Sequence, residues 1–135
     1  MPASIVDCKP YVPAKNFAES QRFYEALRFT LTPGFGGTVD CRLGGMHFRL
    51  QDYFVPDWAN NFMFAIGVPD VHAWYELAAR LHATGAFPTM RIKPVEVASD
   101  GSLITHVVDP AGVLLVFIQR RADPAQALDT SSGSR

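Results

Sequence analysis

The stretch VVDPAGVLLVFIQ, residues 107–119, decides the fold of this chain. Residues 109–112 read Asp-Pro-Ala-Gly, which is typical of a tight turn because proline presets φ and glycine accepts a positive φ. The apolar run that follows predicts a strand over 113–119, and the stretch over 103–108 predicts its partner. The chain therefore closes on a hairpin.

Two segments have the 3.6-residue period of an amphipathic helix. The first begins at Asn16, a favourable N-cap, with Glu19 three residues later as in a capping box. The second begins at Asp70 and runs to about His82. We interpret the stripe residues of both helices, including their aromatic rings, as core: Ser20, Phe23, Tyr24 and Leu27 on the first, and Val71, Trp74, Ala78 and Leu81 on the second.

The rest of the chain is typical of strands and turns. Gly44 and Gly45 predict a tight hairpin turn, since glycine adopts positive φ without strain. The remaining strands are expected over 4–12, 38–43, 46–53 and 61–68, with weaker ones near 29–32 and 88–93.

The order strand, helix and three strands occurs twice, over about 5–53 and 61–119. A βαβββ unit buries only one sheet face against its helix, so two units leave a second, concave face free for a ligand or partner. The sequence predicts an α+β fold, in which two βαβββ units form an open cup-shaped mixed sheet with the helices outside. Residues 1–120 are expected to form a single domain, and the small and polar residues of 121–135 a flexible tail.

Composition excludes several classes of protein. The chain has 135 residues, 48% hydrophobic and 19% charged, with a net charge of -1, so it lacks the cationic excess of a nucleic-acid binder. No apolar run approaches the ~20 residues that span a bilayer, and no secretory signal is visible. Cys8 and Cys41 form neither a metal knuckle nor a disulfide framework. We therefore expect a cytoplasmic protein without nucleic-acid or membrane partners.

The doubled pattern resembles the vicinal oxygen chelate superfamily, which includes glyoxalase I, extradiol dioxygenases, fosfomycin-resistance enzymes and bleomycin-binding proteins. The resemblance covers about residues 5–119, and the Asp-Pro-x-Gly segment followed by an apolar strand is its most specific part. The matching residues are 12–20, 22–27, 44–46, 68–71 and 108–119.

The enzymes of this superfamily hold a divalent metal with His, Glu or Gln side chains on the first and last strands of the two units. Carried over to this chain, those positions fall on Lys9, Arg49, Met63 and Val116. The two cations lack a lone pair, valine lacks a donor atom, and a thioether is a poor ligand for hard metals. The resemblance therefore implies a protein without the shared metal site.

Strand alternation predicts which side chains face the cup. If Lys9 and Arg49 face it, the first unit supplies a polar wall and the second a mainly apolar one. A pocket that joins such walls suits a small molecule. The first wall would carry Asp7, Lys9, Tyr11, Asp40, Arg42, His47, Arg49 and Gln51, and the second Asn61, Met63, Ala65, Ile104, His106, Val108, Leu114, Val116 and Ile118.

Several of these residues allow two interpretations. Lys9 and Arg49 either hold an anion or pair with Asp7 and Asp40, and His47 and His106 either join Asp40 at an unusual metal site or are only hydrogen-bonded. Trp58 either stacks on a planar ligand or packs against the protein. Alternation turns Cys8 and Cys41 toward the core, which argues against a nucleophile.

The favoured function is a metal-free binding protein of the bleomycin-resistance type, a homodimer without a cofactor or catalytic residue. It would bind or sequester an aromatic or anionic molecule, such as an antibiotic, in a crevice. The alternative is a metal-dependent lyase, isomerase or dioxygenase with displaced ligands. The expected ligand-binding residues are Lys9, Tyr11, Arg42, His47, Arg49, Trp58, Met63, His106 and Val116.

Overall fold

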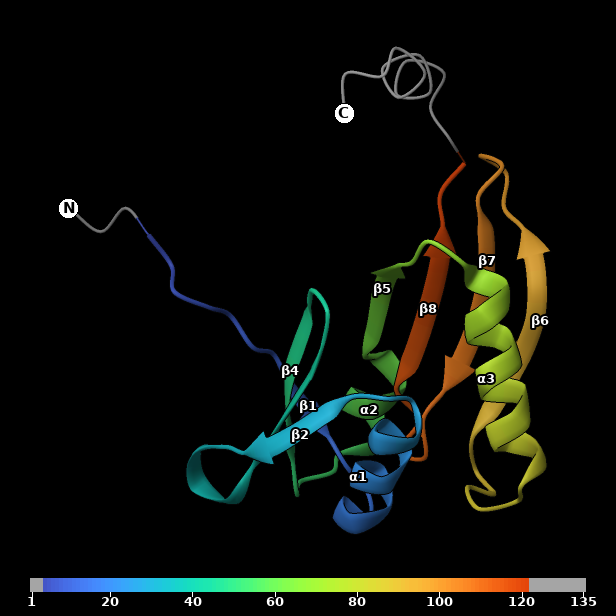
Figure 1. Cartoon of the computed structure of the whole chain (residues 1–135). Coiled ribbons are helices and arrows are strands. Elements are labelled where there is room, and N and C mark those ends of the chain that lie inside the picture. Colours follow the sequence, from blue (N-terminus) through green and yellow to red (C-terminus); the bar gives the residue numbers. More distant parts are fainter. Residues whose placement is uncertain (1–3, 122–135) are drawn as a thin grey trace.

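The computed structural model describes residues 4–121 and contains two βαβββ units (Figure 1). Residues 122–135, which hold almost all of the expected tail, lie outside the described part. The elements of the first unit and the linker are β1 (Tyr11–Pro13), α1 (Phe17–Ala26), β2 (Thr30–Pro33), the 3-10 turn η1 (Phe35–Gly37), β3 (Val39–Leu43), β4 (Met46–Gln51) and α2 (Pro56–Asn61). Those of the second unit are β5 (Met63–Gly67), α3 (Val71–Ala83), β6 (Arg91–Val97), β7 (Leu103–Val108) and β8 (Leu114–Gln119).

Each unit contributes a four-stranded mixed sheet. The strand order is β1-β4-β3-β2 in the first sheet and β5-β8-β7-β6 in the second. In both, the strand before the long helix pairs in parallel with the last strand of the unit, and the other pairs are antiparallel. α3 lies against one face of the second sheet (Figure 1). The α+β class and the doubled βαβββ architecture are confirmed.

The two long helices begin where the sequence predicts. The side chain of Asn16 accepts a hydrogen bond from the Glu19 amide at 3.0 Å, and that of Asp70 accepts one from the Ala73 amide at 3.2 Å. Each satisfies one of the free N–H groups of a first helical turn. Gln119, at the end of β8, accepts a further bond from the Val71 amide at 3.0 Å and so ties α3 to the sheet.

One hydrophobic core runs through both units. Phe23 and Tyr24 of α1 are fully buried with Phe48 of β4, and Leu115 and Phe117 of β8 belong to the same cluster. The rings of Phe23 and Tyr24 meet edge to face at 5.2 Å, and those of Tyr24 and Phe48 at 4.9 Å. Edge-to-face aromatic pairs add stability beyond the area they bury. Within residues 4–121, no helix is long and apolar enough to cross a lipid bilayer.

A buried hydrogen bond links α1 to the β7–β8 turn of the second unit. The Tyr24 hydroxyl donates to Asp109 Oδ2 at 2.6 Å, while Asp109 Oδ1 accepts from the amides of Ala111 and Val113 at 2.8 and 3.0 Å. The predicted Asp-Pro-Ala-Gly turn is confirmed, with Gly112 at φ 100°. Burial raises the pKa of Asp109 to about 6, and the hydrogen bonds from Tyr24 and the turn amides oppose that rise.

The expectation of a strand over 4–12 is wrong for most of its length. Only Tyr11–Pro13 forms a strand with β4, and the contact extends by one hydrogen bond, from the Arg49 amide to the Pro10 carbonyl at 2.9 Å. Ile5 and Val6 are 85% and 99% exposed, and this segment leaves the first unit as an extended chain (Figure 1). Cys8 is therefore exposed rather than directed into the core, whereas Cys41 is buried as expected.

The linker and the second unit differ from expectation in two places. Pro56 opens the short helix α2 in a stretch expected to be a loop, since its fixed φ suits the first helical turn. The strand expected over 88–93 is β6, Arg91–Val97, because a turn bonded from the Met90 amide to the Phe87 carbonyl precedes it. The other strands differ from their expected bounds only at their ends.

We predict that Tyr24→Phe lowers the free energy of unfolding by about 1–3 kcal/mol, because it leaves a buried carboxylate oxygen without its donor. The loss of that donor raises the pKa of Asp109 above its present value near 6. The penalty is therefore fully present at about pH 8 and shrinks as the pH falls to about 5, where the carboxyl is protonated in both proteins. Denaturant unfolding at both pH values measures it.

Tyr53→Phe is the matched control, since Tyr53 is 57% exposed and its hydroxyl can bond to water. An equal stability of Tyr24→Phe and the parent at the higher pH would contradict the structural role of this hydrogen bond.

Candidate functional site

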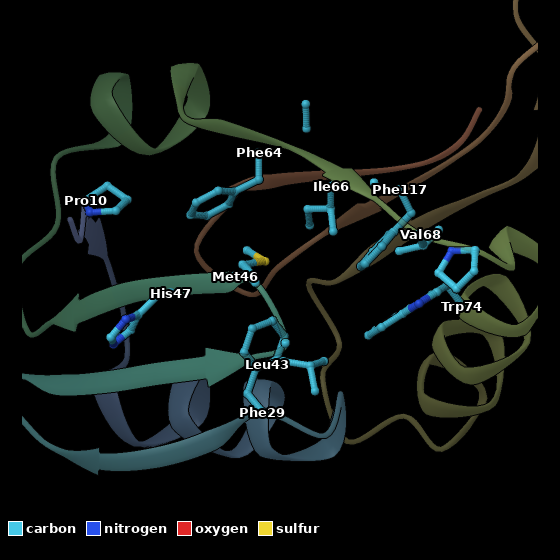
Figure 2. A pocket seen from close by; sticks show the side chains of 15 residues that line it. Pro10, Phe29, Leu43, Met46, His47, Phe64, Ile66, Val68, Trp74 and Phe117 are labelled. Carbon is cyan, nitrogen blue, oxygen red and sulfur yellow. The ribbon is translucent and has the colours of Figure 1, made fainter. Parts of the chain in front are cut away.

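A groove of about 560 Å³ lies between the two units and is lined mainly by apolar side chains. Figure 2 shows Phe64 and Ile66 on one side, Phe29 and Leu43 on the other, and Met46 between them. Its volume is in the range of small-molecule sites, which are concave and mostly apolar. The lining residues are Pro10, Phe29, Leu43, Gly44, Gly45, Met46, His47, Phe64, Ala65, Ile66, Gly67, Val68, Pro69, Trp74 and Phe117.

Two of the lining residues, Trp74 and Phe117, form a stacked aromatic pair. Their rings stack at a centroid distance of 4.6 Å and an angle of 15°. Phe117 is buried on the face of β8 that is turned toward the helix. Trp74 is only partly buried, although it lies on the core-facing stripe of α3. An indole that is supported from behind and open to the groove can stack on a planar aromatic molecule.

Polar groups are few in the groove. His47 lies at the end of the groove where Pro10 also lies (Figure 2), and the indole N–H of Trp74 is the other polar side-chain group among the lining residues. Gly44, with φ 56°, makes the β3–β4 turn that forms part of the wall. Such a lining binds through apolar contact area and uses one or two hydrogen bonds to orient a ligand.

The expected polar wall exists on the free face of the first sheet. The register pairs Tyr11 with Arg49, Asp40 with Arg49, and Arg42 with His47, so these side chains share one face as alternation predicts. Lys9, which precedes β1, reaches the same cluster through its contact with Asp40. Of the residues expected to bind a ligand, this cluster therefore gathers Lys9, Tyr11, Arg42, His47 and Arg49.

Asp40 occupies the place between the two cations where an anionic ligand was considered. Arg49 donates to its carboxylate from Nε at 2.7 Å and from Nη2 at 3.2 Å, and Lys9 Nζ lies 3.8 Å from it. Lys9 also bonds to Asp7 at 3.1 Å, and the Arg49 guanidinium lies over the Tyr11 ring. The hydrogen bonds from Arg49 lower the pKa of Asp40. These contacts favour pairing within the protein over binding of an external anion.

The other expected residues lie elsewhere. Met63, His106 and Val116 share the free face of the second sheet, where His106 and Val116 are register partners. Trp58 lies on α2, with its ring 6.2 Å from Tyr53. Of all the expected ligand-binding residues, His47 alone lines the groove.

Sequence reasoning missed the aromatic residues of the groove. Trp74 and Phe117 have the spacing of core residues, and that spacing cannot tell a covered ring from one that lies at the edge of the core. The signal that could have singled out Trp74 is its position, because it lies in the first turns of α3, close to the exposed turn over Gly67 and Pro69.

The residues do not fit the metal that vicinal oxygen chelate enzymes hold. Lys9 and Arg49 are ion-paired cations, and Met63 and Val116 offer no nitrogen or oxygen donor in their side chains. His47 and His106 belong to different sheets. Across the described range 4–121, no three His, Cys, Asp or Glu side chains converge into a possible metal site.

No family model and no curated protein matches the chain. Several solved structures are similar to it in fold. A bleomycin resistance determinant encoded on the transposon Tn5 is similar with a TM-score of 0.71 and 23% identity, over 87% of this chain and 100% of that chain. An antibiotic-binding protein from Streptomyces sp. CB03234 has a TM-score of 0.66 and 22% identity, over 90% and 99% of the two chains.

The fold is shared with an enzyme as well. A lactoylglutathione lyase from Agrobacterium tumefaciens has a TM-score of 0.60 and 16% identity, over 88% of this chain and 95% of that one. Together these similarities confirm that the chain has the fold of the vicinal oxygen chelate superfamily.

We predict that Arg49→Ala raises the pKa of Asp40, because it removes the hydrogen bonds that stabilise the ionised carboxylate. Carbon-detected NMR titration of the Asp40 carboxyl measures the change. Arg42→Ala, on the same sheet face, is the control and should leave that pKa nearly unchanged. An unaltered Asp40 titration in Arg49→Ala would show that the pair does not form in solution.

Proposed function

We propose that this chain is a metal-independent cytoplasmic protein that binds and sequesters a planar aromatic small molecule in the groove between its two units. The observation that carries the proposal is the stacked pair of Trp74 and Phe117, which presents an open indole at the side of a 560 Å³ apolar groove. A flat ligand would replace water on that indole and gain both apolar burial and ring stacking.

The solved structures with this fold support binding as the type of function. They include a bleomycin resistance determinant, a bleomycin-binding protein complexed with bleomycin and an antibiotic-binding protein. A binding protein of this kind acts by holding its ligand away from a target, so it needs affinity and no reactive group. The lining has few polar side chains and suits that role better than catalysis.

The proposal names aromatic character and not negative charge for the ligand of the groove. Asp7 and Asp40 already pair with Lys9 and Arg49, the two cations that favour an anion on this face. Those cations also lie outside the lining of the groove. Independence from metal rests on the chemistry of the residues at the superfamily's ligand positions, which cannot coordinate a hard divalent ion.

We predict that Trp74→Ala weakens binding of aromatic antibiotics found by a thermal-shift screen, bleomycin among them, by about tenfold or more. Calorimetry gives the affinity, and quenching of tryptophan fluorescence reports the stacking. EDTA should leave the affinity unchanged.

Trp58→Ala is the matched control, because Trp58 is the other tryptophan and lies on α2 outside the groove lining. An equal loss in both variants would place the ligand elsewhere, and loss of binding in EDTA would refute metal independence. If no aromatic compound in the screen binds, the proposal fails as a whole.

We further propose that the protein forms a homodimer, with the segment before β1 and the free face of β5 in contact with a second copy. Ile5, Val6 and Met63 are 85%, 99% and 63% exposed, and a second copy of the chain would cover these apolar side chains. Most closed dimers use one self-complementary patch on both subunits, as this surface would.

We predict a mass of twice the 14.9 kDa of the single chain by light scattering. Val6→Asp should shift the mass toward the single chain, because it places a charge in the contact. Val97→Asp is the control, since Val97 is equally apolar and 71% exposed but lies on β6. The mass of a single chain for the parent would contradict the homodimer.

A further inference from the structure

The free face of the second sheet carries a hollow of about 330 Å³ that is separate from the aromatic groove. It lies on the face opposite to the buried residues Thr105, Val107, Leu115 and Phe117, and therefore opposite to α3. Three strands contribute to it. The lining residues are Arg91, Ile92 and Lys93 of β6, His106 and Val108 of β7, and Leu114 of β8.

The strand register brings the basic side chains of this hollow together. Arg91 lies opposite Val108, and Lys93 lies opposite His106, so all four side chains share one sheet face. Leu114 pairs with Val108 on the next strand. At one end of the hollow, Arg91 is thus next to the apolar pair of Val108 and Leu114, while Lys93 and His106 form a basic pair beside it.

Glu96 is the nearby carboxylate, and it satisfies these basic groups incompletely. Its Oε1 lies 3.8 Å from Lys93 Nζ and 3.7 Å from His106 Nδ1, distances longer than a hydrogen bond. His106 Nδ1 is buried and has no hydrogen-bond partner among the described residues. Glu96 therefore lies near one permanent cation, Lys93, and one imidazole, without a hydrogen bond to either.

The floor of the hollow is apolar. Val108 and Leu114 are partly buried and lie beside Arg91, on the two strands next to β6. An inorganic anion would meet the cations but leave this floor uncovered, and a neutral hydrocarbon would leave the cations without a counter-charge. A molecule with a carboxylate at one end and a compact apolar body satisfies both.

We propose that this hollow is a second ligand site, which binds small organic carboxylates with an apolar or aromatic body. The carboxylate lies between the guanidinium of Arg91 and the ammonium of Lys93, and the body lies on Val108 and Leu114. The site is separate from the proposed aromatic groove, because the two surfaces share no lining residue.

The test is an amide NMR titration of the full chain with sodium benzoate, at constant ionic strength. We expect saturable shifts confined to β6, β7 and β8. Acetate has the charge without the body and benzamide has the body without the charge, so both should bind at least about tenfold more weakly than benzoate.

The double variant Arg91→Gln with Lys93→Gln should weaken benzoate binding by about tenfold or more. Both residues are exposed, so their replacement leaves the core intact, and amide spectra of the free variant check the fold. Arg22→Gln with Arg80→Gln, on α1 and α3, is the control for the loss of two positive charges and should retain the parent affinity. Trp74→Ala should also retain it, which separates this site from the groove.

The proposal is overturned if benzamide binds as well as benzoate, if the double variant keeps the parent affinity, or if the shifts do not saturate. Loss of benzoate binding in Trp74→Ala would also overturn it and would assign the carboxylate to the groove.

Discussion

The buried hydrogen bond between Tyr24 and Asp109 is the interaction on which the rest of the structure depends. It joins residues 85 positions apart, at 2.6 Å, and so ties the helix of the first unit to the closing turn of the second. The same carboxylate holds that turn through two backbone amides. A buried carboxylate is costly unless its oxygens are satisfied, so the helix and the turn stabilise each other's position.

The packing of the helices on the sheets also determines where the groove and the hollow lie. In each unit, a helix covers one face of the sheet and the other face is free. Along each strand, successive side chains point to opposite faces of the sheet. On the helix-facing side, the units meet around Phe48, Phe64 and Phe117, and the space that remains at the edge of this core is the aromatic groove. On the free side of the second sheet, the edge strand β6 carries Arg91 and Lys93, and the hollow lies beside them.

Charge pairing distinguishes the two free faces. On the first sheet, Arg49 donates two hydrogen bonds to Asp40, so its charge and two of its donors are already paired within the protein. On the second sheet, Glu96 stays beyond hydrogen-bond distance of Lys93 and His106. A count of charges along the sequence treats these faces alike. Their difference lies in distance and geometry, which decide whether a cation is satisfied within the protein.

The amino-acid sequence by itself determined the local structure and the doubled architecture. The caps at Asn16 and Asp70, the turn after Asp109 and the alternation along β4 and β8 depend on near neighbours, so their patterns predicted the helices, the hairpins and the sheet faces. Tertiary structure alone decided which strand edges are paired, which cations form ion pairs with a carboxylate and which aromatic rings remain exposed. Residues 4–9 belong to no strand, and Trp74 lies at the edge of the core, because packing between distant segments follows no sequence period.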